Sequence, residues 1–312
     1  MANIDISVII PLKDNKEQVA SLIKRLCKET DGIETEFVVV DMNSTDGGVL
    51  NTLNVIKSLN LRGCVVQSGG VSVSSALNTG IRRATGKYLT FVYPSRSYRD
   101  YISQYYRTAQ EKNADFIFAV PENEDGSRVL ISDGVVGTDI IVSLIRSSII
   151  MEFTAVMFSR DFLVSQNICF YDDCLYGYAE AFIYNALLHR PKVTYLPLKL
   201  ERIEIPPEEK DEPKAAKNCL DRLDAMIKIY RLAKELHKND EVLINAIEYQ
   251  KLPSIIMNCV DKLLLEGFKN SSIKKLLKSK DYYKFLDFSK DTDPGLRAKV
   301  LLWKSVPWLY KP

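Results

Sequence analysis

The run Ile6-Ser7-Val8-Ile9-Ile10, which we expect Pro11 to stop, decides the fold of the first part of this chain. A short stretch of β-branched apolar residues without polar alternation predicts a strand that is buried on both faces of a parallel sheet. A second apolar run, residues 37–40, ends at Asp41. Between the two runs, apolar residues recur at helical spacing, so the segment predicts a strand–helix–strand unit.

The same alternation continues beyond Asp41. It predicts strands over residues 64–67 and 88–93, with a helix over residues 74–84 between them. Alternating strands and helices predict an α/β fold, a mostly parallel sheet with helices on both faces. In such sheets ligands bind beyond the carboxyl ends of the strands. The sequence therefore predicts that Pro11, Asp41 and Tyr93 surround one crevice.

Composition narrows the class of protein. The 312 residues carry a formal net charge of +2, which gives no overall field for nucleic acid. The first residues lack the pattern of a signal peptide, and no apolar run approaches the roughly 20 residues that span a bilayer. Six scattered cysteines without a Cys-x-x-Cys pair favour reduced thiols in a cytoplasmic protein. Strand signals stop after residue 205, so we expect an α/β domain over 1–205 and a helical region over 206–312.

The order of motifs resembles inverting family 2 glycosyltransferases, which have the GT-A fold. Residues 6–11 resemble the opening strand of that family, and Asp41 with residues 44–47 resembles its nucleotide-binding loop. Residues 74–91 match the next helix and strand, and residues 170–197 resemble the acceptor-side segment. The resemblance covers about residues 4–200. It implies a GT-A domain that binds a nucleotide-diphosphate sugar.

The resemblance also implies a set of site residues. The aspartate at the position of Asp41 accepts a hydrogen bond from the base, while Asp46 is either part of that loop or a cap of the following helix. The candidate nucleotide-binding residues are Pro11, Leu12, Asp14, Asp41, Asn43, Ser44, Tyr93, Ser95 and Arg96.

Two departures from the family concern the chemistry. Tyr93 and Ser95 occupy the positions of the metal-binding Asp-x-Asp, so the Mg²⁺ or Mn²⁺ usual in the family is not expected here. Arg96 is either a cation that replaces the metal against the diphosphate or a solvated loop residue. Ala181 stands where the family has its catalytic base, which leaves Glu180 as a weak candidate and no firm catalytic residue.

Two functions follow from this conflict. The first is a metal-independent transferase that adds a sugar to a surface polysaccharide or lipid-linked glycan. The second is an inactive relative that binds or supports a partner. Residues 296–310 combine tryptophan with basic residues, so this tail either contacts a membrane interface at the inner face or packs on the protein core or a second subunit.

Overall fold

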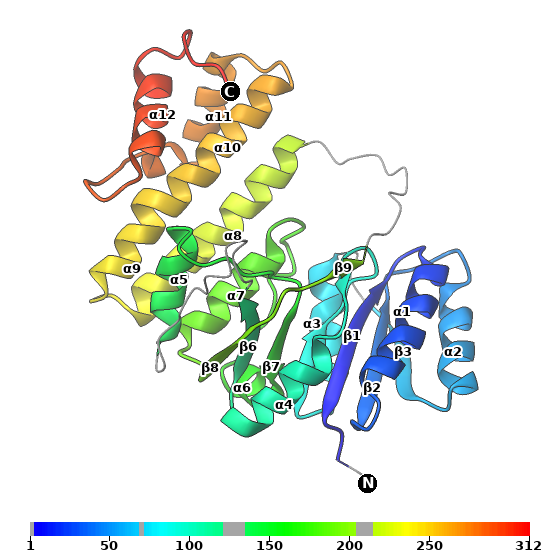
Figure 1. Cartoon of the computed structure of the whole chain (residues 1–312). Helices are drawn as coiled ribbons and strands as arrows, with labels where there is room; N and C mark the ends of the chain where they lie inside the picture. Colours follow the sequence, from blue (N-terminus) through cyan, green and yellow to red (C-terminus); the bar gives the residue numbers. More distant parts are fainter. Residues whose placement is uncertain (1–2, 69–71, 121–134, 204–214) are drawn as a thin grey trace. The chain divides into compact units, whose positions relative to one another are not determined.

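The computed structural model describes residues 3–68, 72–120, 135–203 and 215–312 (Figure 1). The chain divides into two compact units. The first contains Met1–Gly137, Ile149–Asp173 and His189–Glu208; the second contains Thr138–Ser148, Cys174–Leu188 and Glu209–Pro312. The predicted boundary between residues 205 and 206 lies outside the described residues.

A seven-stranded sheet forms the centre of the first unit. Its strand order is β3-β2-β1-β4-β7-β6-β8. Strands β1 to β4 are parallel to one another, whereas β7 runs antiparallel to both of its neighbours, β4 and β6. The strands are β1 (Ile6–Leu12), β2 (Thr35–Asp41), β3 (Arg62–Gln67), β4 (Tyr88–Phe91), β6 (Phe116–Val120), β7 (Val156–Ser159) and β8 (Val193–Pro197), with a separate pair β5 (Ser97–Tyr98) and β9 (Arg202–Ile203). The predicted mostly parallel α/β architecture is confirmed.

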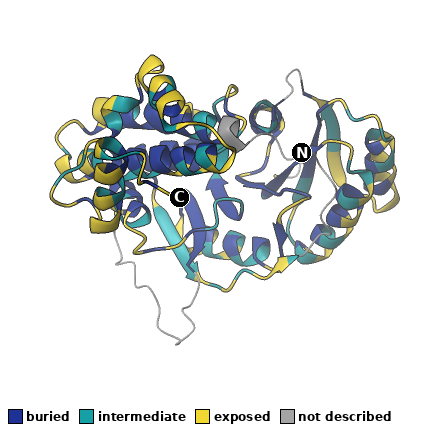
Figure 2. Ribbon diagram, turned by 90° about the horizontal axis from the view of Figure 1, so that it is seen from above, coloured by how far each residue is buried: buried dark blue, intermediate teal, exposed yellow. Residues whose placement is uncertain are grey.

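Helices accompany the sheet of the first unit, namely α1 (Lys16–Glu29), α2 (Gly48–Ser58), α3 (Val73–Arg83), α4 (Ile102–Lys112) and α6 (Arg160–Ser165). Side chains of α1 and α4 share one core cluster with the central strand β1. Helix α3 also packs on β1, and Gly80 makes its close approach feasible because a Cβ there would lie 2.3 Å from Ile9 Cγ2. Figure 2 shows burial following the strands, with exposure on the outer helix faces.

Strand β1 is longer than the sequence predicts, because Pro11 does not end it. Pro11 pairs with Val40 in the β2 register. The Ile9 carbonyl accepts a hydrogen bond from the N–H of Val92, on the β4 side. The Leu12 carbonyl accepts one from the N–H of Met42, on the β2 side. Because backbone groups alternate in direction along a strand, Pro11 faces the β4 side, where pairing has already stopped at Ile9. The missing N–H therefore costs no ladder bond.

The second unit is helical. It contains α5 (Gly137–Ile145), α7 (Tyr178–Leu188), α8 (Ala215–Leu236), α9 (Glu241–Ala246), a π-helical turn (Ile247–Lys251), α10 (Leu252–Leu265), α11 (Asn270–Ser279), a short 3₁₀ turn (Tyr283–Phe285) and α12 (Pro294–Ser305). The tail packs on its own unit through Leu296, Val300 and Trp303 of α12, all buried. Within the described residues, we find no helix long and apolar enough to cross a membrane.

Candidate functional site

Two neighbouring strands bring most of the candidate nucleotide-binding residues to one edge of the sheet. Leu12, the last residue of β1, is paired with Asp41, the last residue of β2. Strand β4 lies on the other side of β1 and leads to Tyr93 two residues after its end. Pro11, Asp41 and Tyr93 thus lie at or just beyond the carboxyl ends of three adjacent strands, and their place around one crevice stays a prediction.

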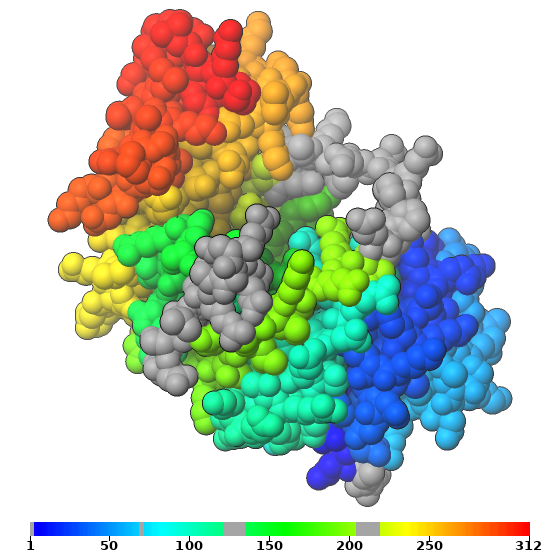
Figure 3. Space-filling model, in the orientation of Figure 1, coloured from blue at the N-terminus to red at the C-terminus, as the bar shows by residue number. Residues whose placement is uncertain are grey.

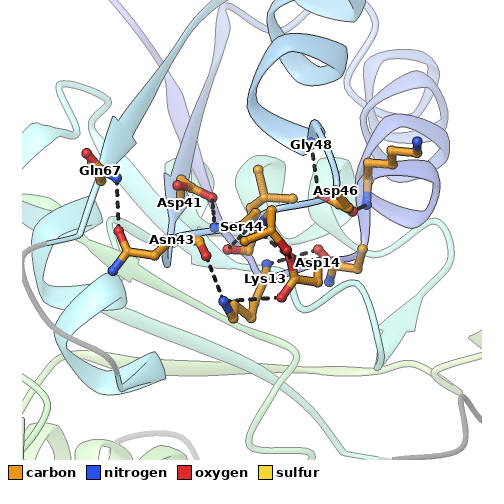
Figure 4. Close-up of polar contacts among 12 residues, drawn as sticks. Lys13, Asp14, Asp41, Asn43, Ser44, Asp46, Gly48 and Gln67 are labelled. Carbon is orange, nitrogen blue, oxygen red and sulfur yellow. Dashed lines mark hydrogen bonds and ion pairs between the residues drawn. The ribbon is translucent and has the colours of Figure 1, made fainter.

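Asp41 is held in place by the loop that follows it. The carboxylate is 4% exposed, and its Oδ1 accepts a 3.1 Å hydrogen bond from the backbone N–H of Ser44. The Ser44 hydroxyl donates to the carbonyl of Leu12 and accepts from the backbone N–H of Asp14. This network fixes the direction of one carboxylate oxygen (Figure 4). Among the described residues, the other oxygen of Asp41 receives no recorded hydrogen bond.

Asp14 joins the loop after β1 to the loop after β2. Its Oδ1 accepts hydrogen bonds of 2.7 Å from the Thr45 N–H and 3.2 Å from the Thr45 hydroxyl. Its Oδ2 lies 3.2 Å from the Lys13 ammonium. The Thr45 N–H and the Lys13 side chain hold the pKa of Asp14 below its usual value. A φ of +47° places Asp14 in the left-handed region, where aspartate is one of the better tolerated residues.

Asn43 extends the same network to β3. Its backbone is also left-handed, with a φ of +60°, and its side-chain oxygen accepts a 2.9 Å bond from the Gln67 amide. The Lys13 ammonium donates to the Asn43 carbonyl at 2.7 Å. Lys13, Thr45 and Gln67 were not among the predicted site residues. Gln67 ends the third parallel strand, so the rule that found Asp41 would also have found it.

Asp46 connects the amino-terminal ends of two helices. Its Oδ1 accepts from the N–H of Gly48, the first residue of α2, and its Oδ2 accepts from the N–H of Lys16, the first residue of α1, both at 2.9 Å. Negative charge at a helix amino terminus is favourable because the first N–H groups have no partner within the helix. The interpretation of Asp46 as a cap is confirmed, and one carboxylate serves both helices.

The turn after β4 brings Arg96 to a carboxylate. Arg96 lies 2.6 Å from Glu152 and donates through Nε to the Tyr98 hydroxyl at 3.2 Å. Tyr98 in turn donates to Glu152, as do the backbone and hydroxyl of Thr154. The hydrogen bond to Tyr98 and the charge of Glu152 raise the pKa of Arg96. Arg96 is therefore an ion-paired residue, neither a bare cation nor a purely solvated one.

Comparisons with known proteins show which family the first part of the chain resembles. Residues 7–92, which span β1 to the end of β4, match the family model for glycosyl transferase family 2. Over these residues the chain is similar to family 2 glycosyltransferases. A search of curated proteins gave no match.

Solved structures extend the likeness over most of the chain. Residues 1–349 of Staphylococcus aureus TarS in complex with UDP-GlcNAc share 18% identity, with a TM-score of 0.58, over 91% of this chain and 81% of that one. A mannosyltransferase from Pyrobaculum calidifontis in complex with GDP-Man and Mn²⁺ shares 15% identity, with a TM-score of 0.56, over 97% and 85%. At these identities what is shared is the fold, which is GT-A.

The donor set after β4 does not fit the divalent metal of family 2. Tyr93 is a buried phenol and Ser95 an exposed hydroxyl, both neutral ligands where a hard cation needs carboxylate oxygens. Glu152 is the carboxylate bonded to this turn. Burial alone would raise the pKa of Glu152, but donors from Tyr98 and Thr154 and the charge of Arg96 together lower it. An anionic Glu152 beside Arg96 already has its counter-ion.

Glu180, the remaining candidate for the family's base, belongs to the second unit and has two cationic partners there. Its Oε1 accepts a 2.5 Å bond from Lys251 and its Oε2 a 2.9 Å bond from Arg222. Burial raises the pKa of Glu180, but these two charges outweigh it and the net pKa is lowered. A carboxylate with a lowered pKa and both oxygens bonded is a poor proton acceptor. Ala181, which the resemblance aligns with the family's base, is 1% exposed, and its methyl side chain cannot accept a proton.

Proposed function

We propose that this chain binds a nucleotide-diphosphate sugar at the carboxyl ends of β1, β2 and β4 and transfers the sugar without a divalent metal. The observation that carries the proposal is the buried Asp41, with one oxygen bonded to Ser44 and the other facing no described donor. Such a preorganised acceptor suits an N–H group of a nucleobase, because the loop fixes its direction before the ligand binds. The relatives in solved structures hold UDP-GlcNAc and GDP-Man.

The acceptor in this proposal is a surface polysaccharide or a lipid-linked glycan. One hydroxyl oxygen of the glycan forms a bond to the anomeric carbon and loses its proton to solvent. The bond from that carbon to the diphosphate breaks, with its electron pair passing to the diphosphate. A cation must then balance the new charge. Lys13 is an exposed cation in the loop network around Asp41, where its ammonium contacts Asp14 and the Asn43 carbonyl. Arg96 would have to leave Glu152 before it could bind a phosphate.

The proposal includes a place in the cell. A lipid-linked acceptor is met at a membrane surface, so we place the protein in the cytoplasm with peripheral contact through part of residues 296–310.

A second function is favoured by the missing base. The hydroxyl proton of the acceptor has to leave during transfer, and Ala181 cannot take it. Glu180 already neutralises Lys251 and Arg222. In this alternative the domain binds a nucleotide sugar or glycan, or supports a partner transferase, without turnover.

Calorimetric titration of the full chain tests the donor site. The ligands are UDP-GlcNAc, GDP-mannose, and CDP- and dTDP-glucose, each with and without Mn²⁺. The matched variant Asp41→Asn keeps Oδ1 as the acceptor for Ser44 but turns the other oxygen into a donor, so we expect binding to fall at least about tenfold. Asp31→Asn, at an exposed turn, is the control. If no nucleotide binds, the donor-site proposal is wrong.

Transfer and binding are separated by restoring the family's carboxylates. The variant Tyr93→Asp/Ser95→Asp/Ala181→Asp supplies the metal ligands and the base at the family's positions. Mn²⁺-dependent hydrolysis of the bound nucleotide sugar by this variant, with none by the wild type, would support the inactive alternative. Wild-type turnover that is unaffected by chelators would support the metal-independent transferase.

A further inference from the structure

Four large apolar side chains are exposed on two turns of the second unit. Leu265 and Phe268 lie at the α10–α11 turn and are 76% and 50% exposed, while Trp308 and Leu309 follow α12 and are 73% and 62% exposed. Burial of such side chains normally stabilises a protein by about 1.5–3 kcal/mol each, so their exposure calls for an explanation. We call these four residues the apolar edge.

Hydrogen bonds tie the two turns together. The Asn270 amide donates to the Pro307 carbonyl at 2.8 Å, and the Trp303 indole N–H donates to the Asn270 side-chain oxygen at 2.7 Å. The Tyr310 hydroxyl donates to Asp261. Trp308 and Leu309 lie between these anchors on one segment, and Leu265 and Phe268 lie between them on the other. Figure 3 shows the C-terminal tail (red) beside the α10–α11 region (orange).

The anchors hold the segments in place, so the edge does not result from a loose chain end. Tyr310, beyond Trp308 and Leu309, is only 5% exposed, and Trp303 before them is 1% exposed. Lys299 adds an ion pair of 2.5 Å to Asp261. The protein therefore presents apolar side chains to solvent from a fixed support.

The surroundings of the edge are basic. Residues 262–312 contain twelve lysines and arginines against five aspartates and glutamates, a formal net charge of +7 in a chain whose total is +2. Lys262, Lys269 and Lys311 adjoin the edge in sequence and are exposed, with Glu266 the acidic residue among them. Helix α11 contributes Lys274, Lys275 and Lys278.

We propose that the apolar edge is a peripheral membrane-binding site for bilayers that contain anionic lipids. Trp308 enters the interface with Leu265, Phe268 and Leu309, and the lysines contact lipid phosphates. Four protruding side chains are few for a stable protein interface, which needs about 20–30 residues on each side. The inference refines the membrane contact proposed for residues 296–310, moving it from the face of α12 to the turns, and it holds whether or not the chain transfers a sugar.

Sedimentation of the full chain with vesicles tests the inference. The vesicles are phosphatidylcholine alone and phosphatidylcholine with one quarter phosphatidylglycerol. We expect binding to the anionic vesicles that weakens as salt rises, and little binding to the neutral ones. Trp308→Ser/Leu309→Ser should lower partitioning at least about tenfold. Lys262→Gln and Lys269→Gln should each lower it about fivefold.

A matched control separates this edge from exposed apolar residues in general. Leu50→Ser/Leu53→Ser removes two exposed leucines, 66% and 44% exposed, from α2 of the first unit, and should bind vesicles like the wild type. Brominated lipid should quench the fluorescence of Trp308 but not that of the buried Trp303. The fluorescence of Trp303 also reports whether each variant is folded. Binding that is absent in the wild type, or equal in the Trp308 and Leu50 variants, would overturn the inference. Sedimentation velocity showing that the wild type self-associates and the Trp308 variant does not would assign the edge to a second copy instead.

Discussion

The charged cluster around Glu180 allows the sharpest stability test in this molecule. Glu180 is 6% exposed and bonds to Lys251 and Arg222, which come from the π-helical turn and from α8. Glu180→Gln preserves the size of the side chain and removes its charge. The two cations then keep their positions without a counter-ion in the second unit.

The expected loss follows from the burial of each partner. Breaking a buried ion pair by removing one partner costs about 3–5 kcal/mol. The Arg222 side chain is 40% exposed and can rehydrate, whereas that of Lys251 is 14% exposed and cannot do so fully. The Lys251 ammonium also lies 5.5 Å from the centre of the Tyr184 ring. This cation–π contact remains in the variant and continues to stabilise the charge of Lys251. We therefore expect the lower end of the range, about 3 kcal/mol.

Urea denaturation, monitored by tryptophan fluorescence, measures the loss of stability in the second unit. The chain has two tryptophans, Trp303 and Trp308, and both belong to the second unit. With a slope of about 2 kcal/mol per molar urea, the midpoint should fall by about 1.5 M. The control Asp281→Asn breaks an exposed ion pair with Lys284 and should change the free energy of unfolding by less than about 0.5 kcal/mol.

A double variant checks the cause. In Glu180→Gln/Lys251→Met the buried cation disappears with its partner, so this protein should be more stable than Glu180→Gln alone, because replacing both members of a buried pair is often near neutral. A Glu180→Gln midpoint within 0.3 M of the wild type's, about 0.6 kcal/mol at this slope, would refute the reasoning. A double variant whose loss is the sum of the single losses would refute it equally.

Three further predictions concern pH and the first unit. The folded pKa of Glu180 is lowered, so the stabilisation from its ion pairs is complete above the ordinary pKa of 4.5 and is lost as pH falls through the folded pKa. Lowering the pH should therefore reduce the free energy of unfolding of the wild type more steeply than that of Glu180→Gln. Glu152→Gln should free Arg96 and strengthen UDP binding in metal-free calorimetry by several-fold, a gain that an added Arg96→Ala should abolish. Asp46→Ala removes one helix-terminal bond from each of two helices and should cost about 1–2 kcal/mol by far-ultraviolet circular dichroism, with Asp31→Ala near zero as the control.

The fold could be predicted because its signals are local. Each buried parallel strand is a short apolar run, and each strand end in a parallel sheet marks the same edge, which is why Asp41 was found from its position alone. The error at Pro11, in contrast, has a cause that is distant in sequence. Whether a proline ends a strand depends on which neighbour its nitrogen faces, and that requires the register of β1 with β4.

The partners of the site residues could not be predicted, because they are distant in sequence. Arg96 and Glu152 are 56 residues apart, and Glu180 and Lys251 are 71 residues apart. No periodicity or spacing connects such pairs, although their charge balance determines what each residue can do. The left-handed backbone of Asp14, which directs its carboxylate to Thr45, is equally invisible in composition or pattern.

These partners divide the site residues into two groups. Asp41 and Asp14 are held by neutral N–H and hydroxyl donors and by one lysine, so the loops after β1 and β2 keep acceptors directed by the fold itself. Arg96 and Glu180, which the resemblance to family 2 suggested as candidates, are each bound to an opposite charge. Recognition of a nucleotide requires only the first group. The proposed transfer needs a cation as well, and the two candidates, Lys13 and Arg96, are each already paired with a carboxylate. Under the proposed function, use of Arg96 against the diphosphate would therefore require a measurable rearrangement of Arg96 away from Glu152.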